Sequence, residues 1–133
     1  EPLSGYTTVK REVSFNDSRF DIYAENEHEQ CYIEVKNVTL KQGDLALFPD
    51  AKTERGRKHL NTLIEVKKAG MRAVMLFIIQ RMDVKMFAPA STIDPKYAEA
   101  LKLAFNSGVE IIPLQVEVFP DKIELRKILP YTL

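Results

Sequence analysis

Two acidic residues and a lysine stand on adjacent stretches whose composition is typical of β-strands. Asp21 lies in the stretch 19–23, and Glu34 and Lys36 lie in the stretch 31–36. Both stretches are rich in aromatic and β-branched residues that alternate with polar ones. Carboxylates from neighbouring strands supply the hard oxygen ligands that Mg²⁺ prefers, and a lysine beside them can orient a water and neutralise phosphate charge. These residue types therefore favour metal-dependent attack on a phosphodiester.

A β-hairpin would bring these side chains together. The intervening segment 24–30 is polar and suits a loop. A turn centred on Glu27 and His28 places Asp21 across from Glu34, and we expect this register because it collects the apolar side chains on one buried surface. Those side chains are Phe20, Ile22, Ile33 and Val35. Two opposed carboxylates repel unless a cation offsets the charge. The alternative is a hairpin whose polar face is merely solvated.

An aspartate followed, one strand later, by Glu-x-Lys resembles the motif of the PD-(D/E)xK nucleases. Residues 1–13 have apolar side chains at helical spacing, which predicts a short first helix. Glu12 near its end is a candidate further metal ligand, and the alternative is a surface charge. Asp50 follows Pro49, but this Pro-Asp pair comes after Lys36, in the wrong order for the motif, so Asp50 is at best a supporting residue.

A basic stretch at the start of an expected helix is the candidate phosphate-binding site. Thr53 is a suitable N-cap for a helix that runs to about Ala69, with Gly70 closing it. The cationic side chains of its first turns oppose the helix dipole, which makes sense if a phosphate docks there. The alternative is a solvated charge run. His59 is a secondary candidate. The phosphate- or DNA-binding candidates are Arg55, Lys58, Thr53, Arg57, Gln80 and Arg19.

The remaining chain predicts an α/β domain with a mixed central sheet and a restriction-endonuclease-like core of order αβββαβ. The apolar run 71–79 lacks alternation, so it is expected to be a buried strand covered on both faces. Gln80, Arg81 and Asp83 follow it, at the end of a strand where open α/β sheets bind ligands. Further elements are expected as short strands at 45–48 and 84–87, a helix at 94–107 and a strand pair at 109–119 and 123–129. Pro113 predicts an edge position or a bulge.

Composition limits the function classes. A chain of 133 residues forms one domain with a real core. Lys+Arg and Asp+Glu both count 19, so a phosphate-binding surface must be a local patch. The single cysteine, Cys31, excludes an internal disulfide and fits a cytoplasmic protein. We expect no signal peptide and no membrane span. A sugar-binding module is disfavoured because the chain has no Trp.

Longer phrases resemble the sugar fermentation stimulation protein A family. The resemblance covers almost the whole chain in one order. The phrases that carry it are 3–6 (Leu-Ser-Gly-Tyr), 18–21 (Ser-Arg-Phe-Asp), 31–40, 48–60, 70–74, 93–98, 108–111 and 129–133. It implies a PD-(D/E)xK fold, DNA binding without marked sequence preference, and a link to regulation of sugar (maltose) metabolism.

Mapped onto this chain, the family's motif falls on Asp21, Glu34 and Lys36, with Glu12 as the first-helix acid. Phe20 stands where the motif usually has proline. The resemblance also implies that residues 1–133 are one nuclease-like domain, the C-terminal half of proteins that begin with an OB-like domain, which is absent from this chain. The function expected is that of a Mg²⁺- or Mn²⁺-dependent nuclease. The alternative is a DNA-binding regulator that keeps the scaffold without turnover.

Overall fold

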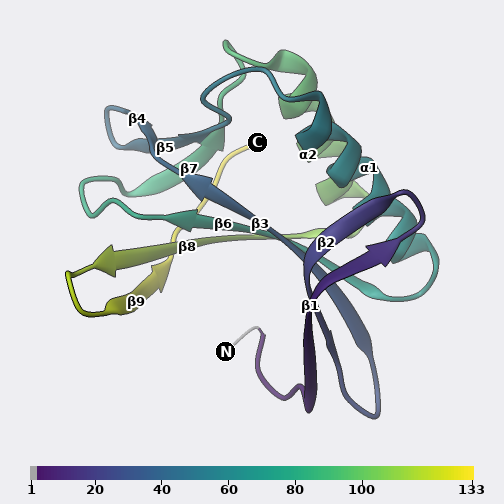
Figure 1. The fold of residues 1–133 in the computed structure, drawn as a ribbon. Helices are drawn as coiled ribbons and strands as arrows, with labels where there is room; N and C mark the ends of the chain where they lie inside the picture. Colours follow the sequence, from purple (N-terminus) through teal and green to yellow (C-terminus); the bar gives the residue numbers. More distant parts are fainter. Residues whose placement is uncertain (1–2) are drawn as a thin grey trace.

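A six-stranded mixed sheet is the central element of the computed structural model, which describes residues 3–133 (Figure 1). Its strands lie in the order β1 (Thr8–Phe15), β2 (Ser18–Glu25), β3 (Gln30–Val38), β6 (Arg72–Ile79), β8 (Glu110–Val118) and β9 (Ile123–Ile128). The three central strands, β3, β6 and β8, are parallel to one another. The outer strands join them antiparallel. The predicted mixed α/β sheet is confirmed.

Two helices cover one face of this sheet. Parallel neighbours need a crossover connection, and α1 (Glu54–Lys68) lies on the connection from β3 to β6, while α2 (Pro95–Asn106) lies on that from β6 to β8. The helix predicted after Thr53 and the helix predicted at 94–107 are confirmed. The hydroxyl of Thr53 accepts a hydrogen bond from the Gly56 amide as N-cap of α1, and Asp94 caps α2.

A second, three-stranded sheet contains the short strands. It consists of β4 (Leu40–Gln42), β5 (Leu45–Phe48) and β7 (Met86–Pro89), in the order β4-β5-β7. Strands were expected at 45–48 and 84–87, but as parts of one central sheet. The expected αβββαβ order therefore needs correction. The strand at 45–48, expected as its third strand, lies in the second sheet, and the first three strands of the central sheet are β1, β2 and β3.

The helix expected over residues 1–13 is wrong. Residues 8–13 belong to β1, and residues 1–2 lie outside the described part. Val9 and Val13 are four residues apart, a spacing that a helix and a strand of period two both satisfy. Val13 and Phe15 pack against the core, which is the alternation of a strand.

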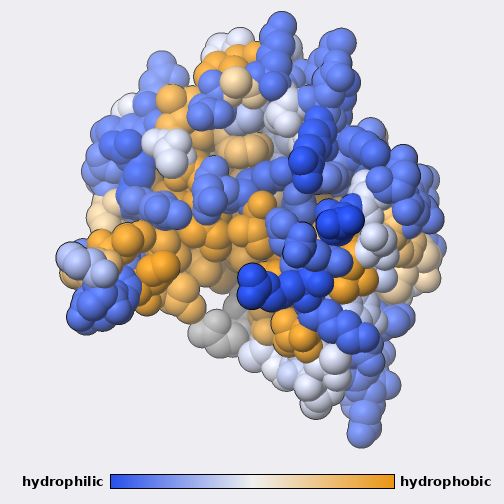
Figure 2. Space-filling view, viewed as in Figure 1, coloured by the Kyte–Doolittle hydropathy of each residue, from blue (hydrophilic) through white to orange (hydrophobic). Residues whose placement is uncertain are grey.

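The core divides into two layers, one on each face of the sheet. The layer under the helices contains the large side chains Phe20, Tyr32, Leu60, Leu63, Phe77, Tyr97 and Leu101. The opposite layer contains Ala24, Cys31, Ile33, Val74, Leu76 and Ile112, and neither helix covers it. Hydrophobic residues are visible at the lower left of Figure 2, where the β8–β9 hairpin lies. Val118, Ile123, Leu125 and Ile128 are exposed on this hairpin.

Pro113 lies within β8, between β6 and β9, so the expected edge position is wrong. A register shift between Gln115 and Val116 provides an irregularity two residues further along. Within residues 3–133, no helix combines the length and apolar character that crossing a membrane requires.

Candidate functional site

The β2–β3 hairpin has the register that the sequence predicted. Ile22 pairs with Ile33 and Tyr23 with Tyr32, which places the turn at residues 27–28. The backbone ladder ends at Ile22. Beyond it, Oδ2 of Asp21 accepts a hydrogen bond of 3.0 Å from the Val35 amide. The side chain of Asp21 therefore accepts the hydrogen bond that a backbone carbonyl of β2 would accept in a regular ladder.

The pleat of the β1–β2 pair is interrupted beside Asp21. Glu12 stands opposite Asp21, between the pairs Arg11–Ile22 and Val13–Phe20, and its φ is +55°. A non-glycine residue rarely adopts this conformation. Phe20 packs in the layer under the helices, whereas Ile22 packs in the opposite layer. The expectation that these two side chains share a face is therefore wrong.

Glu34 and Lys36 share a face as predicted, but that face is covered by α1. Glu34 is only 3% exposed. Its Oε2 lies 3.1 Å from Nζ of Lys36 and 2.7 Å from Nδ1 of His59, on α1. Its Oε1 is buried and has no hydrogen-bond partner. A buried carboxylate oxygen without a partner costs free energy, so it points to a missing ligand.

Burial is the main cause of the shifted pKa values of Glu34 and His59. Burial raises the pKa of Glu34, Lys36 acts against this rise, and the negative charge of Asp21 adds to it. Burial also lowers the pKa of His59 to about 4, helped by the positive charges of Lys36 and Arg55. His59 is therefore neutral at physiological pH. The two carboxylates of Asp21 and Glu34 are close enough to affect each other, as the predicted register requires.

Glu12 does not complete this acidic group. It is exposed on β1, not on a helix, and its carboxylate lies 3.7 Å from Nη1 of Arg19. Across residues 3–133, no set of three or more His, Cys, Asp or Glu side chains is arranged to hold a metal ion. The donors at the centre of the site are therefore two carboxylates. This set suits Mg²⁺ or Mn²⁺, which take one or two carboxylates and fill their other positions with water and phosphate oxygens.

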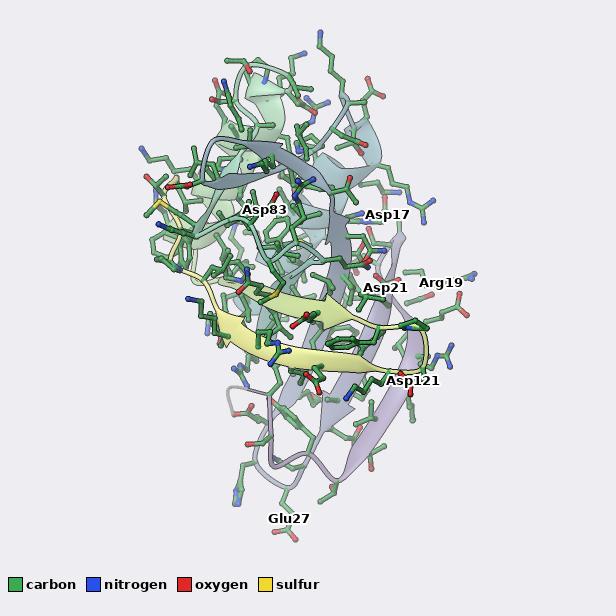
Figure 3. All side chains as sticks on the ribbon, turned by 90° about the vertical axis from the view of Figure 1, so that its left-hand side faces the viewer. Asp17, Arg19, Asp21, Glu27, Asp83 and Asp121 are labelled. Carbon is green, nitrogen blue, oxygen red and sulfur yellow. The ribbon has the colours of Figure 1, made fainter. Side chains whose placement is uncertain are left out.

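The predicted cations divide between two regions. Arg55 and Lys58 lie close enough to His59 for the positive charge of each to lower the pKa of that imidazole. Since His59 contacts Glu34, both cations are on the side of α1 near the acidic pair. Lys58 also contacts the β1–β2 turn, where Nζ lies 3.1 Å from the backbone oxygen of Asp17 and 3.5 Å from its carboxylate. Figure 3 shows Asp17, Arg19 and Asp21 at the β1–β2 end of the molecule.

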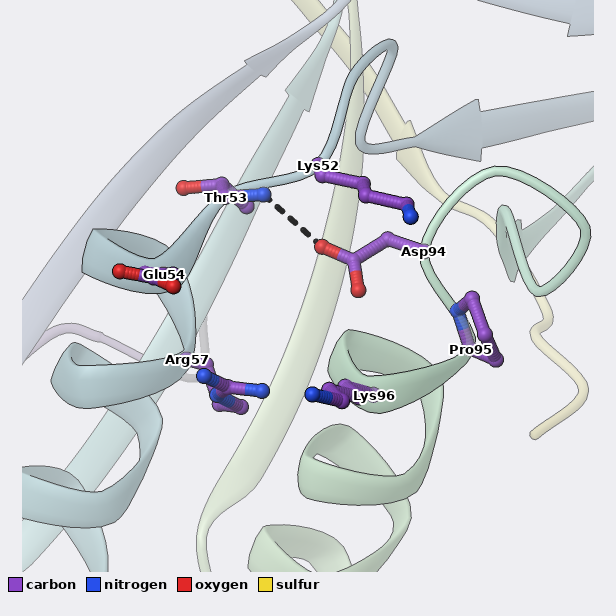
Figure 4. A pocket seen from close by; sticks show the side chains of 7 residues that line it. All are labelled: Lys52, Thr53, Glu54, Arg57, Asp94, Pro95 and Lys96. Carbon is purple, nitrogen blue, oxygen red and sulfur yellow. Dashed lines mark hydrogen bonds between the residues drawn. The ribbon is translucent and has the colours of Figure 1, made fainter.

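Arg57 and Thr53 instead belong to a cavity of about 290 Å³ where the N-termini of α1 and α2 meet (Figure 4). Its lining residues are Lys52, Thr53, Glu54, Arg57, Asp94, Pro95 and Lys96. The hydroxyl and the amide of Thr53 are both occupied, by the Gly56 amide and by the Asp94 carboxylate respectively. Asp94 also accepts a hydrogen bond of 3.0 Å from the Tyr97 amide.

Gln80 lies away from the acidic pair. Its Nε2 is 3.5 Å from Oδ1 of Asn37, which is three residues beyond Glu34 and therefore about 10 Å along β3. Arg81 and Asp83, noted beside it in the sequence, bind each other through paired contacts of 2.9 and 2.8 Å. Asp50 is exposed in the turn before α1.

The sequence interpretation kept His59 only as a secondary candidate, and the structure places it in direct contact with Glu34. A signal for this position exists in the sequence. His59 is spaced four and seven residues from Leu63 and Val66, on the stripe of α1 that is buried against the sheet. A titratable side chain on such a stripe must find a polar partner across the core.

Comparison with known proteins identifies relatives over nearly the whole chain. A protein homologous to the sugar fermentation stimulation protein in Pelobacter propionicus is 46% identical over 98% of this chain, and one in Caldanaerobacter subterraneus is 48% identical over 95%. The solved structure of the SfsA protein of Pyrococcus furiosus, in complex with Ca²⁺, matches with a TM-score of 0.88 and 34% identity over 93% of this chain.

This chain spans only part of those relatives. It covers 57% and 55% of the two bacterial proteins and 54% of the Pyrococcus chain. The family described as "Sugar fermentation stimulation protein RE domain" matches residues 1–122, which is most of this sequence. The chain therefore belongs to the sugar fermentation stimulation protein family.

Proposed function

We propose that this domain is a PD-(D/E)xK-type nuclease domain that hydrolyses phosphodiester bonds of DNA with the aid of Mg²⁺ or Mn²⁺. The observation that carries the proposal is the carboxylate of Glu34, which is buried beside Asp21 with one oxygen unpartnered. Two carboxylates on neighbouring strands with an adjacent lysine form the constellation that this chemistry needs. The Ca²⁺ complex of the Pyrococcus relative supports divalent-metal binding by the family.

Asp21 and Glu34 would hold the metal ion, which would supply Lewis-acid stabilisation of the scissile phosphate and lower the pKa of a bound water. Asp21 is fixed for this role by its hydrogen bond from the Val35 amide. Lys36 adds an ammonium group 3.1 Å from Glu34, where it can donate hydrogen bonds to a water or to a phosphate oxygen. Its charge would also offset the negative charge that develops on the phosphate.

The substrate class follows from the cations on the same side. Arg55 and Lys58 can contact phosphates on either side of the bond that is cleaved. Such contacts carry no sequence information, so we expect DNA binding without marked sequence preference. The chain as a whole has no net charge, which makes this local group the main source of affinity for the backbone.

A plasmid-nicking assay in Mg²⁺ or Mn²⁺ tests the proposal. Glu34→Gln and Asp21→Asn each remove a carboxylate charge with little change of shape, and each is expected to lower the nicking rate at least about 100-fold. Asp121→Asn is the matched control, because Asp121 is an exposed acid at the tip of the β8–β9 hairpin (Figure 3). Nicking that survives Asp21→Asn and Glu34→Gln together rejects the site.

A second candidate function is a DNA-binding regulator without turnover. The observation in its favour is that Glu12 is turned to Arg19, which leaves two carboxylates and no third. In that case Arg55→Ala weakens DNA binding, Glu34→Gln does not, and no metal-dependent product forms. A role in regulating sugar (maltose) metabolism belongs to this candidate. An OB-like domain in the full-length protein would add affinity for DNA under either function.

A further inference from the structure

His59 is a buried histidine on the inner side of α1. Its side chain is 6% exposed, and its ring centroid lies 6.1 Å from that of Phe20. It begins the buried stripe that continues with Leu63 and Val66, so α1 delivers the imidazole directly onto β3. Its position therefore follows from the docking of α1 on the sheet.

The imidazole has one strong polar contact in the site. Its Nδ1 lies 2.7 Å from Oε2 of Glu34, while Nζ of Lys36 is 3.5 Å from the same Nδ1 and 3.1 Å from Oε2. An ammonium group can only donate, and an ionised carboxylate can only accept. If Nδ1 donates to Glu34, it cannot also accept from Lys36, so both groups donate to Oε2.

The consequence is an asymmetric carboxylate. Oε2 of Glu34 accepts from two donors, Lys36 and His59, whereas Oε1 is buried and accepts no hydrogen bond. A carboxylate fixed at one oxygen cannot rotate to satisfy the other within the protein. The unpartnered oxygen is then held in one orientation.

We propose that His59 is a positioning residue that clamps Oε2 of Glu34 and so presents Oε1 to a divalent cation. The inference rests on the proposed metal-binding function and adds a residue to it. Outer contacts of this kind orient ligands, and their loss commonly costs about 10- to 100-fold in metal affinity. His59 does not touch the ion or the substrate in this role.

A purely structural role for His59 predicts a different pattern of variants. His59→Asn keeps an N–H donor near the position of Nδ1, whereas His59→Leu keeps the bulk and removes the donor. Thr62→Val is the matched control. It removes a buried hydroxyl on the same helix that bonds to Ser18 at 2.8 Å, whereas the polar contacts of Glu34 are with Lys36 and His59.

The test is calorimetric titration with Ca²⁺, with the free energy of unfolding measured for each variant. We expect His59→Leu to weaken Ca²⁺ binding at least about 10-fold, and His59→Asn to restore it to within about threefold of the wild type. Thr62→Val should lose stability at unchanged Ca²⁺ affinity. Wild-type affinity in His59→Leu overturns the inference alone, whereas a wild-type protein that binds no Ca²⁺ overturns the proposed metal-binding function as well.

A second measurement needs neither the metal nor a folded variant. Long-range ¹H–¹⁵N correlation spectra of the wild-type protein at pH 7.5 report which ring nitrogen of His59 carries the proton. We expect the proton on Nδ1, donated to Glu34. A proton on Nε2 alone contradicts the clamp, because Nδ1 would then have no hydrogen to donate.

Discussion

Oδ2 of Asp21 accepts a hydrogen bond of 3.0 Å from the backbone amide of Val35, the residue between Glu34 and Lys36. The contact joins β2, one residue beyond its last backbone pairing with β3, to the part of β3 that carries the other two site residues. Asp21 therefore has two roles, as a link between β2 and β3 and as a charge beside Glu34. Substitution can separate them.

Asp21→Asn keeps an oxygen that can accept from the Val35 amide, while Asp21→Ala removes it. Asp21→Ala is expected to lower the free energy of unfolding by about 1 kcal/mol, and Asp21→Asn to leave it unchanged or slightly raised because repulsion with Glu34 is relieved. Both variants should lose Ca²⁺ binding. Denaturant unfolding and calorimetry measure the two effects, and equal destabilisation by both variants contradicts the linking role.

Lys36 offsets the buried negative charge of Glu34. Lys36→Met is expected to lower the free energy of unfolding at pH 7.5 by about 1–3 kcal/mol, because an ionised carboxylate loses a donor inside the protein. The loss should shrink on acidification, since the raised pKa of Glu34 makes this carboxylate take up a proton at a higher pH than an exposed one does. Lys122→Met breaks an exposed pair with Glu124 of the same length, 3.1 Å, and should cost less than about 0.5 kcal/mol. Losses of equal size in both variants would show that burial of the pair has no effect.

The lowered pKa of His59 makes stability depend on pH. Between pH 6.5 and about 4 the unfolded imidazole binds a proton and the folded one does not, so its contribution is present above pH 6.5 and is lost as the pH falls. The raised pKa of Glu34 acts in the opposite direction. The difference in unfolding free energy between the wild type and His59→Asn should therefore shrink on acidification, by at most about 1.4 kcal/mol per pH unit. A difference that stays constant from pH 7 to pH 5 contradicts the shift.

Gly56 lets α1 approach α2 closely. A Cβ at this position would lie 2.9 Å from Cγ2 of Thr53 and 3.2 Å from Cε2 of Tyr97. Gly56→Ala is therefore expected to destabilise by about 1–3 kcal/mol through overpacking, although alanine favours a helix by about 1 kcal/mol. Asn61→Ala, at an exposed position of the same helix, should change stability by less than about 0.5 kcal/mol in thermal unfolding. A stabilised Gly56→Ala protein contradicts the close approach.

Arg55 makes no ion pair among the residues described, so its charge is available to a phosphate. In a plot of log affinity for duplex DNA against log salt concentration, Arg55→Ala should reduce the slope by about one. Lys58→Ala should reduce it less, because Lys58 is already 3.5 Å from the Asp17 carboxylate. Lys127→Ala, on β9, should leave the slope unchanged. Equal slopes for Arg55→Ala and Lys127→Ala would show that Arg55 on α1 does not contact the DNA backbone.

Local patterns predicted most of the elements, and the errors concern relations between them. The polar turn at Glu27 and His28 was enough to set the hairpin register, because a period of two leaves few alternatives. The same period cannot say which face a helix will cover, so the burial of Glu34 under α1 did not follow from it. The contact between Glu34 and His59 joins residues 25 positions apart on different elements, and only the docked helix brings them together.

Backbone conformation accounts for the remaining errors. Phe20 and Ile22 point to opposite faces of the sheet, and this change accompanies the positive φ of Glu12 on the neighbouring strand. A glutamate does not by its type require a positive φ, so the sequence did not predict the change. The second sheet depends on pairing between β5 and β7, whose residues are about forty positions apart. Long-range pairing of this kind leaves no periodic signal in a single sequence.

The double hydrogen bond of Asp94 has a consequence for how the domain opens. One carboxylate holds the first amide before α1, that of Thr53 at 2.9 Å, and a first-turn amide of α2, that of Tyr97 at 3.0 Å. Neither helix can unwind from its start without disturbing the acceptor of the other. In amide exchange with deuterium, the leading turns of both helices should therefore behave as one cooperative unit, with matching protection. Because α1 carries His59, which contacts Glu34, this shared acceptor couples the start of α2 to the acidic side chain on β3.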